Sequence, residues 1–196
     1  LWLADHDHVE LSNLQRQIAH GQDDIDKAKV VSASDTIAML NEGVVTRCIS
    51  EKLTGQLLLD AVSAVDLVVD ASDNFSTRFE LNKACVEYEK PLVSGAAIRA
   101  EGQVVVFDSR DRSSPCYRCL YPGKDVEEPL SCSESGVLSP LVGVIGSMQA
   151  LLAVKLLSGF GSVENGQLMV FDASTLEERK MRPIKRAGCP VWLAGN

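Results

Sequence analysis

The stretch LWLADHDHVELSNLQRQIAHGQDDIDKAKV, residues 1–30, decides the predicted fold and function. It opens with a short apolar strand that runs directly into Asp5 and Asp7. A carboxylate at the carboxyl end of a buried strand is where open α/β sheets hold the ribose of a nucleotide. Arg16 and Lys29 follow, and both can hold phosphate, Arg as a fork and Lys as a point charge. The stretch therefore predicts a nucleotide site at one edge of an α/β sheet.

The hexapeptide SNLQRQ, residues 12–17, makes this prediction more specific. In register with strand-Asp-x-Asp and a downstream Lys, it resembles the ATP site of the ubiquitin-activating superfamily, above all of the bacterial ThiF/MoeB/HesA adenylyltransferases. The resemblance extends along almost the whole chain. It implies that Asp5 holds the ribose of ATP, that Asn13, Arg16 and Lys29 hold the phosphates, and that Asp7 and Gln17 contribute. Without the resemblance, a strand followed by a solvated polar loop would be the alternative.

Strand and helix patterns alternate along the chain. A near-continuous apolar run at residues 65–71 is typical of a buried parallel strand. Together these patterns predict a Rossmann-like α/β fold, with a mostly parallel sheet extended by antiparallel strands and helices on both faces. We expect helices at 26–41, from 54 to 65 and at 75–89, and further strands at 44–49, 92–97, 98–108, 167–172 and 175–181.

The resemblance also sets the expected domain organisation. Residues 1–196 should form a single ThiF-type adenylation domain, and residues 109–139 a long crossover and active-site loop within it. In the family, a strand, a glycine-rich turn and a helix precede the position of Leu1, and backbone N–H groups at such a turn cradle phosphate. We therefore expect a truncated member that lacks its N-terminal β-α unit.

A second acidic loop follows the strand at residues 65–71. Asp73 and Asn74 match the family's Asp-Asn pattern at this point, which implies that Asp73 helps to bind Mg²⁺ and the triphosphate, with Asn74 beside it. Mg²⁺ prefers carboxylate and phosphate oxygens, which suits this role. The alternative is that Asp73 caps the next helix, and the two roles are compatible.

Cysteines suggest a metal site that is incomplete. Cys116 and Cys119 form a CxxC pair, the commonest half of a tetrahedral zinc site. In the family a second CxxC near the carboxyl end completes the site, but here that pair reads Cys189-Pro190-Val191-Trp192. Tryptophan cannot bind zinc, and losing one of four ligands weakens the site greatly. Two alternatives for the metal stay open: Zn²⁺ bound by Cys116, Cys119 and Cys189, or no metal at all. The CxxC pair could also be a redox pair or two unreactive thiols.

Cys132 lies in the long loop, among Ser, Glu and Gly residues. The resemblance makes it the candidate thiol for covalent contact with a carrier protein's C-terminal acyl group, because a thiolate is a good nucleophile. An unreactive loop cysteine is the alternative.

Composition limits the partners. The chain has 196 residues and a net charge of −8, which argues against nucleic acid. The apolar stretch at residues 137–157 is long enough to span a membrane, but Pro140, Gln149 and Lys155 interrupt it. We expect a buried helix, partly covered by a second subunit in a homodimer, and no membrane partner. No secretory signal is visible, so a cytoplasmic location is expected.

The resulting functional hypothesis is ATP-dependent adenylation of the C-terminal carboxylate of a small ubiquitin-like sulfur-carrier protein, for thiamine or molybdopterin biosynthesis. LWLAD and DIDKAK are nearer to the thiamine-type sequences, and PLVSGAAIRAEGQ is nearer to the molybdopterin type. One alternative is a non-catalytic relative that binds a carrier or a partner subunit. Another is a nicotinamide-dependent oxidoreductase, which would need a GxGxxG fingerprint that the chain does not contain.

Overall fold

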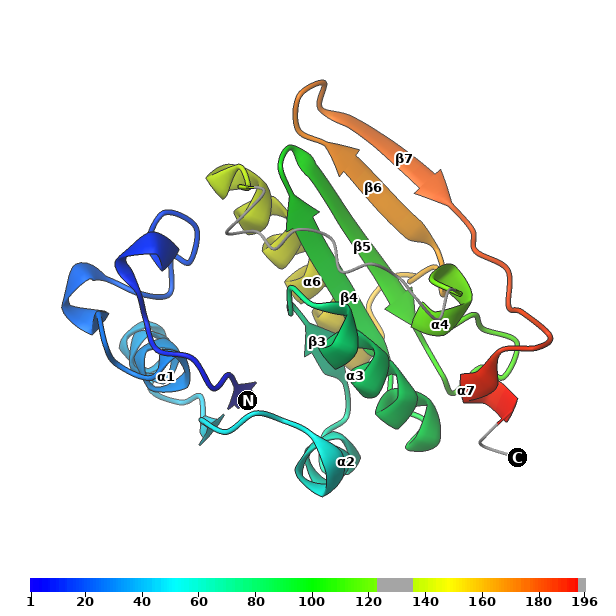
Figure 1. Ribbon diagram of the computed structural model, residues 1–196, viewed down its shortest axis with the longest axis horizontal. Coiled ribbons are helices and arrows are strands. Elements are labelled where there is room, and N and C mark those ends of the chain that lie inside the picture. Colours follow the sequence, from blue (N-terminus) through cyan, green and yellow to red (C-terminus); the bar gives the residue numbers. More distant parts are fainter. Residues whose placement is uncertain (123–135, 194–196) are drawn as a thin grey trace. The chain divides into compact units, whose positions relative to one another are not determined.

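β1 (Trp2–Ala4) pairs in parallel with β2 (Arg47–Ile49), and helix α1 (Lys29–Leu40) contacts both strands. These elements belong to the first of two compact units, Leu1–Gly55 and Gln56–Asn196, here called unit 1 and unit 2. The structure, a computed structural model, describes residues 1–122 and 136–193 (Figure 1).

The connection from β1 to α1 is built from turns rather than regular structure. It contains two short 3₁₀ helices, Leu11–Asn13 and Gln22–Asp24. The helix was expected to begin at Asp26, but Asp26 has a φ of 70°, a left-handed conformation that no α-helix can include. Helix α1 therefore begins at Lys29, after an isolated bridge between His8 and Ala28.

Unit 2 is organised around a five-stranded sheet in the order β3-β4-β5-β6-β7. Only β3 and β4 are parallel in this sheet, whereas the three other pairings are antiparallel. The strands are β3 (Val68–Asp70), β4 (Leu92–Ile98), β5 (Glu101–Phe107), β6 (Leu168–Asp172) and β7 (Glu177–Met181).

The sheet pattern confirms the Rossmann-like α/β class and the antiparallel extension, and corrects one detail. Antiparallel pairings outnumber parallel ones among the described residues, so the expected "mostly parallel" character is wrong. The reason is local. Only Arg99 and Ala100 separate β4 from β5, and a connection this short can join only antiparallel strands. Arg99 has a φ of 52°, as tight hairpin turns require.

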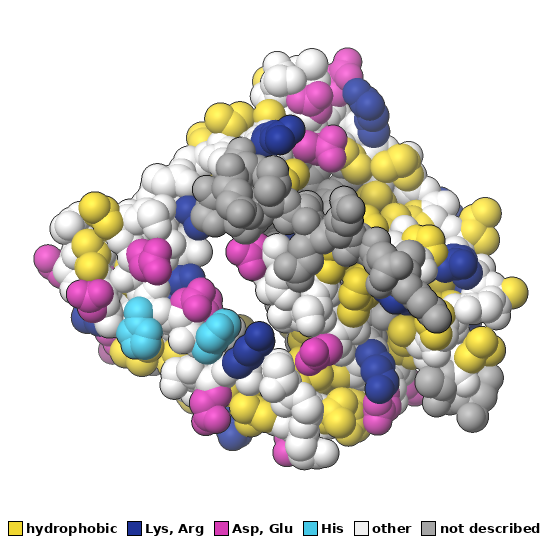
Figure 2. Space-filling model, in the orientation of Figure 1, with side chains coloured by type: hydrophobic (Ala, Val, Ile, Leu, Met, Phe, Trp, Pro, Cys, Tyr) yellow, Lys and Arg dark blue, Asp and Glu magenta, His cyan; other side chains and the backbone are white. Residues whose placement is uncertain are grey.

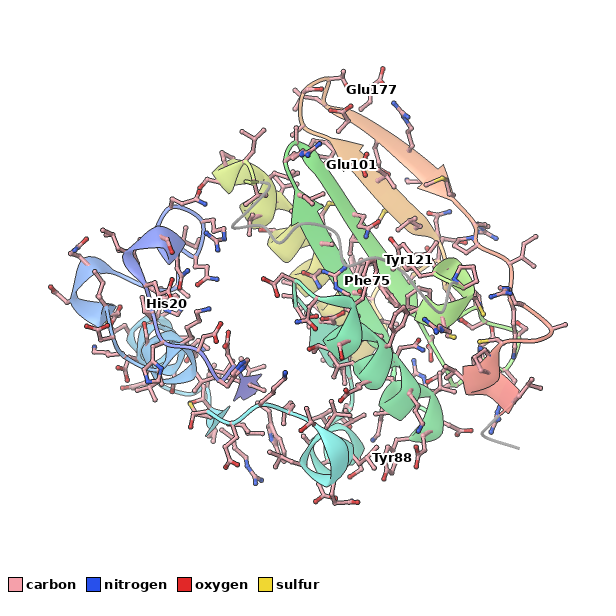
Figure 3. The ribbon with its side chains drawn as sticks, viewed as in Figure 1. His20, Phe75, Tyr88, Glu101, Tyr121 and Glu177 are labelled. Atoms are coloured by element: carbon pink, nitrogen blue, oxygen red, sulfur yellow. The ribbon has the colours of Figure 1, made fainter. Side chains whose placement is uncertain are left out.

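Helices cover both faces of this sheet, as predicted (Figure 1). Helix α6 (Ser139–Ser158) packs Met148, Leu152 and Leu156 against Val93, Val104 and Val106. On the opposite face, α3 (Phe75–Glu87) and α4 (Tyr117–Leu120) bring aromatic rings together: Phe107 on β5 meets Tyr117, and Phe75 meets Tyr121 (Figure 3). The remaining helices are α2 (Gly55–Ser63) and α7 (Pro190–Leu193).

Helix α6 was expected to be buried, but only one of its sides is. Leu141, Ile145 and Gln149 are buried against the sheet, but four large apolar side chains are exposed: Val144, Leu151, Val154 and Leu157. By length and composition the helix could also cross a membrane, a test that the core helices of soluble proteins pass as well. One side of the helix therefore packs on the sheet, and the other side carries exposed apolar side chains.

Candidate functional site

Two acids and a lysine meet at the end of β1. The Lys29 Nζ lies 3.1 Å from an Asp7 carboxylate oxygen and 3.9 Å from Asp5. The backbone fixes this meeting, since the Lys29 N–H donates to the Asp7 carbonyl at 2.9 Å and the Asp7 N–H donates to the Asp5 carboxylate at 2.9 Å. The Lys29 side chain is only 13% exposed, whereas Asp7 is 56% exposed. Of the predicted site residues, Asp5, Asp7 and Lys29, here called the trio, therefore lie together, and both carboxylates are accessible to solvent.

The SNLQRQ side chains have local partners instead. Asn13 is buried, and its Oδ1 accepts a hydrogen bond from the Glu10 N–H at 3.1 Å. Arg16 donates from Nη1 to the Ser12 carbonyl at 3.0 Å. In the described part of the chain, no hydrogen bond or ion pair joins Asn13, Arg16 or Gln17 to the trio. The buried Oε1 of Gln17 has no partner among these residues either, so it is available to a donor.

Three histidines lie in unit 1, where Figure 2 shows histidine, acidic and basic side chains at the surface. His6 lies beside Asp5 and Asp7, with all three ligand atoms within 4.8 Å of one another, but the His6 side chain is 54% exposed. His20, to which the sequence assigned no role, shares a 2.8 Å hydrogen bond with Ser32 (Figure 3). Burial lowers the His20 pKa, so the ring is a neutral structural partner at pH 7.

The acidic loop after β3 is built on a buried carboxylate. Asp70 is 1% exposed and accepts the Ser72 N–H at 2.9 Å, the Ser72 hydroxyl at 2.6 Å and the Ser94 hydroxyl at 3.1 Å. Asn74 caps α3, because its Oδ1 accepts the Thr77 N–H at 2.9 Å. Asp73, between these anchors, is exposed, and within residues 1–122 and 136–193 its carboxylate has no hydrogen-bond or ion-pair partner. The cap is Asn74, which leaves Asp73 available to a cation.

Two supports of this loop were missed by the sequence reasoning. Gln149 on α6 donates from Nε2 to the Asp70 carbonyl at 2.8 Å and to the Val93 carbonyl at 3.1 Å. A Cβ at Gly95 would lie 2.3 Å from the Gln149 amide carbon, so any larger residue there would displace the Gln149 amide. Arg78 is 8% exposed and folds back onto the loop. The only available signal was a polar or charged residue at a core-facing helix position.

The cysteine cluster is assembled in unit 2. Cys116, Cys119 and Cys189 are all buried, with the Sγ of Cys116 3.9 Å from that of Cys119 and 3.6 Å from that of Cys189. Sulfurs around a tetrahedral zinc with bonds of about 2.3 Å lie about 3.8 Å apart. A hydrogen bond from the Cys116 thiol lowers the pKa of the Cys119 thiol. Three donors therefore fit a metal.

The fourth side of the cluster is closed by Trp192, which is buried against the three cysteines. Its indole offers only an N–H donor, and that N–H has no partner among the described residues. The Lys185 Nζ lies 3.7 Å from the centre of the Trp192 ring. Within the described part of the chain a closed four-ligand site is therefore absent. The predicted thiol Cys132 lies outside the described residues, as does the whole segment 123–135 of the long loop.

Comparison with known proteins agrees with this geometry. The sequence profile of the ThiF family matches residues 1–191. The chain belongs to the ThiF family. It is 42% identical over 191 residues to the Escherichia coli molybdopterin-synthase adenylyltransferase, covering 97% of this chain and 76% of that protein. It is also 42% identical over 197 residues to the E. coli sulfur carrier protein ThiS adenylyltransferase, covering 77% of it.

Solved structures support the fold. The crystal structure of E. coli MccB with ATP superposes with a TM-score of 0.82 at 18% identity, covering all of this chain. The chain spans 59% of the length of that MccB chain. The family resemblance predicted from residues 1–30 and from Asp73-Asn74 is confirmed, as is the ThiF-type α/β fold.

Proposed function

We propose that this ThiF-family chain is an adenylyltransferase that uses ATP to activate the C-terminal carboxylate of a small ubiquitin-like sulfur-carrier protein. The observation that carries the proposal is the assembled trio of Asp5, Asp7 and Lys29, in a chain 42% identical along nearly its full length to two sulfur-pathway adenylyltransferases. The thiamine and molybdopterin pathways are supported equally, because the chain is 42% identical to an adenylyltransferase of each kind. A cytoplasmic location is part of the proposal.

The reaction turns a poor acyl donor into a reactive one. A carboxylate oxygen of the carrier attacks the α-phosphorus of ATP, and the bond to the bridging oxygen of the β-phosphate breaks. The products are an acyl-adenylate, which is a mixed anhydride, and pyrophosphate. No proton needs to move in this step, so the protein contributes positioning and charge neutralisation.

Each side chain has a defined part in this proposal. Asp5 accepts hydrogen bonds from the ribose hydroxyls, and Arg16 and Lys29 bind the phosphates. Asn13, Asp7 and Gln17 contribute around them. Lys29 is paired with two carboxylates before ATP binds. When ATP binds, Lys29 exchanges these anionic partners for the triphosphate, so its charge is paired in both states. The pairing keeps the Lys29 side chain aimed at the site.

Mg²⁺ fits the second loop. Asp73 offers an exposed carboxylate without a described partner, which is the hard oxygen donor that Mg²⁺ prefers. Asn74 follows it, although its side-chain oxygen is already used by the helix cap. When bound, Mg²⁺ would neutralise phosphate charge as pyrophosphate leaves. Asp73 would hold the ion, and the buried Asp70 network would hold Asp73.

The test is ATP–pyrophosphate exchange with a panel of carriers that end in Gly-Gly. We expect exchange that depends on one carrier and on Mg²⁺, and its loss in Arg16→Ala. Arg47→Ala is the matched control, because Arg47 lies over the Trp2 ring at 4.1 Å and is exposed. Carrier binding without exchange by the wild type would overturn the proposal and select the non-catalytic alternative. Wild-type exchange in Arg16→Ala would remove the role given to Arg16.

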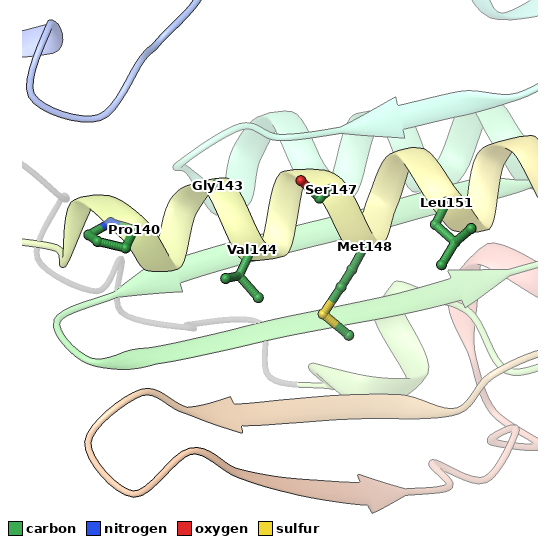
Figure 4. A pocket seen from close by; sticks show the side chains of 6 residues that line it. All are labelled: Pro140, Gly143, Val144, Ser147, Met148 and Leu151. Carbon is green, nitrogen blue, oxygen red and sulfur yellow. The ribbon is translucent and has the colours of Figure 1, made fainter.

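A homodimer would cover the exposed side of α6. An apolar groove of about 530 Å³ runs along this helix (Figure 4), lined by Pro140, Gly143, Val144, Ser147, Met148 and Leu151. Exposed apolar surface of this extent marks contact sites in soluble proteins. Light scattering should report a dimer for the wild type and a monomer for Leu151→Glu. A monomeric wild type would contradict this assignment.

Two assignments to cysteines complete the proposal. Cys116, Cys119 and Cys189 would bind Zn²⁺ weakly, since Trp192 occupies the fourth side, and Trp192→Cys should retain zinc through dialysis against a chelator that strips the wild type. Equal retention would show that another ligand completes the site. Cys132 would contact the carrier's acyl group, and Cys132→Ser should lose any covalent adduct with the carrier while keeping exchange.

A further inference from the structure

Arg78 is a buried cation that the proposed mechanism does not use. It lies in the second turn of α3 and is 8% exposed. Its Nε donates to the Ser72 carbonyl at 3.2 Å and its Nη2 donates to the same oxygen. Nη2 also reaches the Gly95 carbonyl at 3.4 Å, and Nη1 donates to the Tyr117 hydroxyl at 3.3 Å. Because two N–H groups of the guanidinium donate to one carbonyl oxygen, Arg78 fixes the position of that peptide bond.

The peptide that Arg78 fixes is the one next to Asp73. The Ser72 carbonyl belongs to the bond that joins Ser72 to Asp73. On its other side Ser72 is held by Asp70, through its N–H and its hydroxyl. Ser72 therefore lies between a buried anion and a buried cation, and Asn74 is held separately by the helix cap. Asp73 is exposed between two immobilised neighbours.

Charge and chemistry explain why arginine stands here. A buried cation needs polar partners and a nearby anion. Burial opposes the charged form of Arg78, but the Asp70 carboxylate and the hydrogen bond to Tyr117 favour that form, and the pKa of Arg78 is raised. Burial in turn raises the pKa of Tyr117 to about 12, so the phenol is neutral and accepts the Arg78 N–H at pH 7. Lysine lacks the planar fork that reaches Ser72, Gly95 and Tyr117 together.

We propose that Arg78 is the positioning residue of the metal-binding loop: through the Ser72 carbonyl it holds Asp73 in the orientation that binds Mg²⁺ with the triphosphate. This inference rests on the proposed function, because it assigns Asp73 to Mg²⁺. Arg78 touches neither substrate nor metal in this arrangement. Outer partners of a ligating side chain typically change metal affinity by about 10- to 100-fold when they are removed.

The test compares Arg78→Lys with Arg118→Lys, a matched control on α4 whose guanidinium lies over the Phe79 ring at 4.2 Å. Exchange is measured against Mg²⁺ concentration, with Asp73→Asn alongside. Binding of Mn²⁺ in the presence of a non-hydrolysable ATP analogue is measured by electron paramagnetic resonance, which does not depend on turnover. We expect Arg78→Lys to need about 10-fold more Mg²⁺ and to bind Mn²⁺ about 10-fold more weakly, with KM for the carrier unchanged and Arg118→Lys like the wild type.

Each outcome separates this inference from the proposed function. An inactive wild type refutes the proposed function itself, and normal Mn²⁺ binding by Asp73→Asn refutes the metal role of Asp73. If Asp73→Asn loses Mn²⁺ while a folded Arg78→Lys binds it normally, the role of Arg78 is overturned. Should Arg78→Lys fail to fold, Arg78→Met removes every donor to the Ser72 carbonyl, and wild-type Mn²⁺ binding by that folded variant overturns the inference equally. Recovery of Arg78→Ala by added guanidinium would support it.

Discussion

The two acidic loops at strand ends carry the same kind of side chain but are held in opposite ways. After β1, the carboxylates themselves make the contacts: Asp5 and Asp7, 38% and 56% exposed, share Lys29. After β3, the exposed Asp73 makes no described contact, and the buried Asp70, Arg78 and Gln149 hold the backbone around it. In the first loop the residues proposed to bind ATP also hold the loop together, whereas in the second the proposed ligand residue and its supports are different residues.

This difference sets what mutations can reveal. A substitution in the first loop changes ligand contacts and local structure together, because the ion pairs are exposed and few. In the second loop the ligand group can be changed without disturbing the core, and the core can be changed without removing the ligand group. Exposed ion pairs contribute little to stability, while buried polar groups cost a great deal when they lose their partners.

The largest expected effect separates binding from support in the second loop. Asp73→Asn keeps the size of the side chain but removes the charge that would hold Mg²⁺. We expect exchange to fall by about 10³-fold, while the free energy of unfolding changes by no more than about 0.5 kcal/mol. Asp66→Asn is the control, another exposed Asp that lies near the other end of β3. A large loss of stability in Asp73→Asn would show that this carboxylate is structural after all.

In the first loop a single change should act on both binding and local structure. Lys29→Met removes the cation between Asp5 and Asp7, leaves two carboxylates close together and takes a positive charge from the phosphates. Exchange should fall by about 10²-fold, with a higher KM for ATP. Lys27→Met, which removes an exposed partner 2.8 Å from Asp24, should change exchange by no more than about twofold. Equal effects of the two substitutions would contradict the role of Lys29.

The sequence named candidate ligand groups but not the groups that support them. Asp5, Asp7 and Lys29 were named from acids at a strand end and a downstream lysine, and Asp73 was named because Asp73-Asn74 matches the family's Asp-Asn pattern. Arg78 and Gln149 were missed because their partners are distant along the chain: Gln149 donates to Asp70, 79 residues away, and Arg78 donates to Tyr117, 39 residues away. A single sequence records the buried polar residue but not what it meets.

The same limit applies to elements and clusters. The strands and helices were predicted from periodicity, but the start of α1 and the balance of parallel and antiparallel pairings depended on single backbone conformations at Asp26 and Arg99. The cysteines were predicted from spacing, and the structure brings Cys189 within 3.6 Å of Cys116. That Trp192 closes the cluster followed from its position in the motif. The motif did not predict that the indole N–H of Trp192 has no hydrogen-bond partner among the described residues.

The support of the second loop can be weakened without touching the loop itself. Gln149→Leu keeps most of the side-chain volume but leaves the Asp70 and Val93 carbonyls without their donor in the core. We expect a loss of about 2 kcal/mol in the free energy of unfolding, measured by urea denaturation. Gln56→Leu on the exposed face of α2 removes only a hydrogen bond to Asp60 and should stay within about 0.5 kcal/mol of the wild type. If both variants unfold at the same urea concentration, the Gln149 amide is not part of the support.

The smallest expected effect distinguishes two hydroxyls that bind the same buried carboxylate. Ser72→Ala and Ser94→Ala each remove one donor to Asp70, at 2.6 Å and 3.1 Å, and each should cost about 1 kcal/mol of stability. Ser72 adjoins Asp73, whereas Ser94 lies within β4. Only Ser72→Ala should therefore also raise the Mg²⁺ concentration needed for half-maximal exchange, by about threefold, the equivalent of less than 1 kcal/mol. If Ser94→Ala raised it as much, general loosening of the core rather than the backbone next to Asp73 would set the metal affinity, and the contrast between the two loops would be one of stability alone.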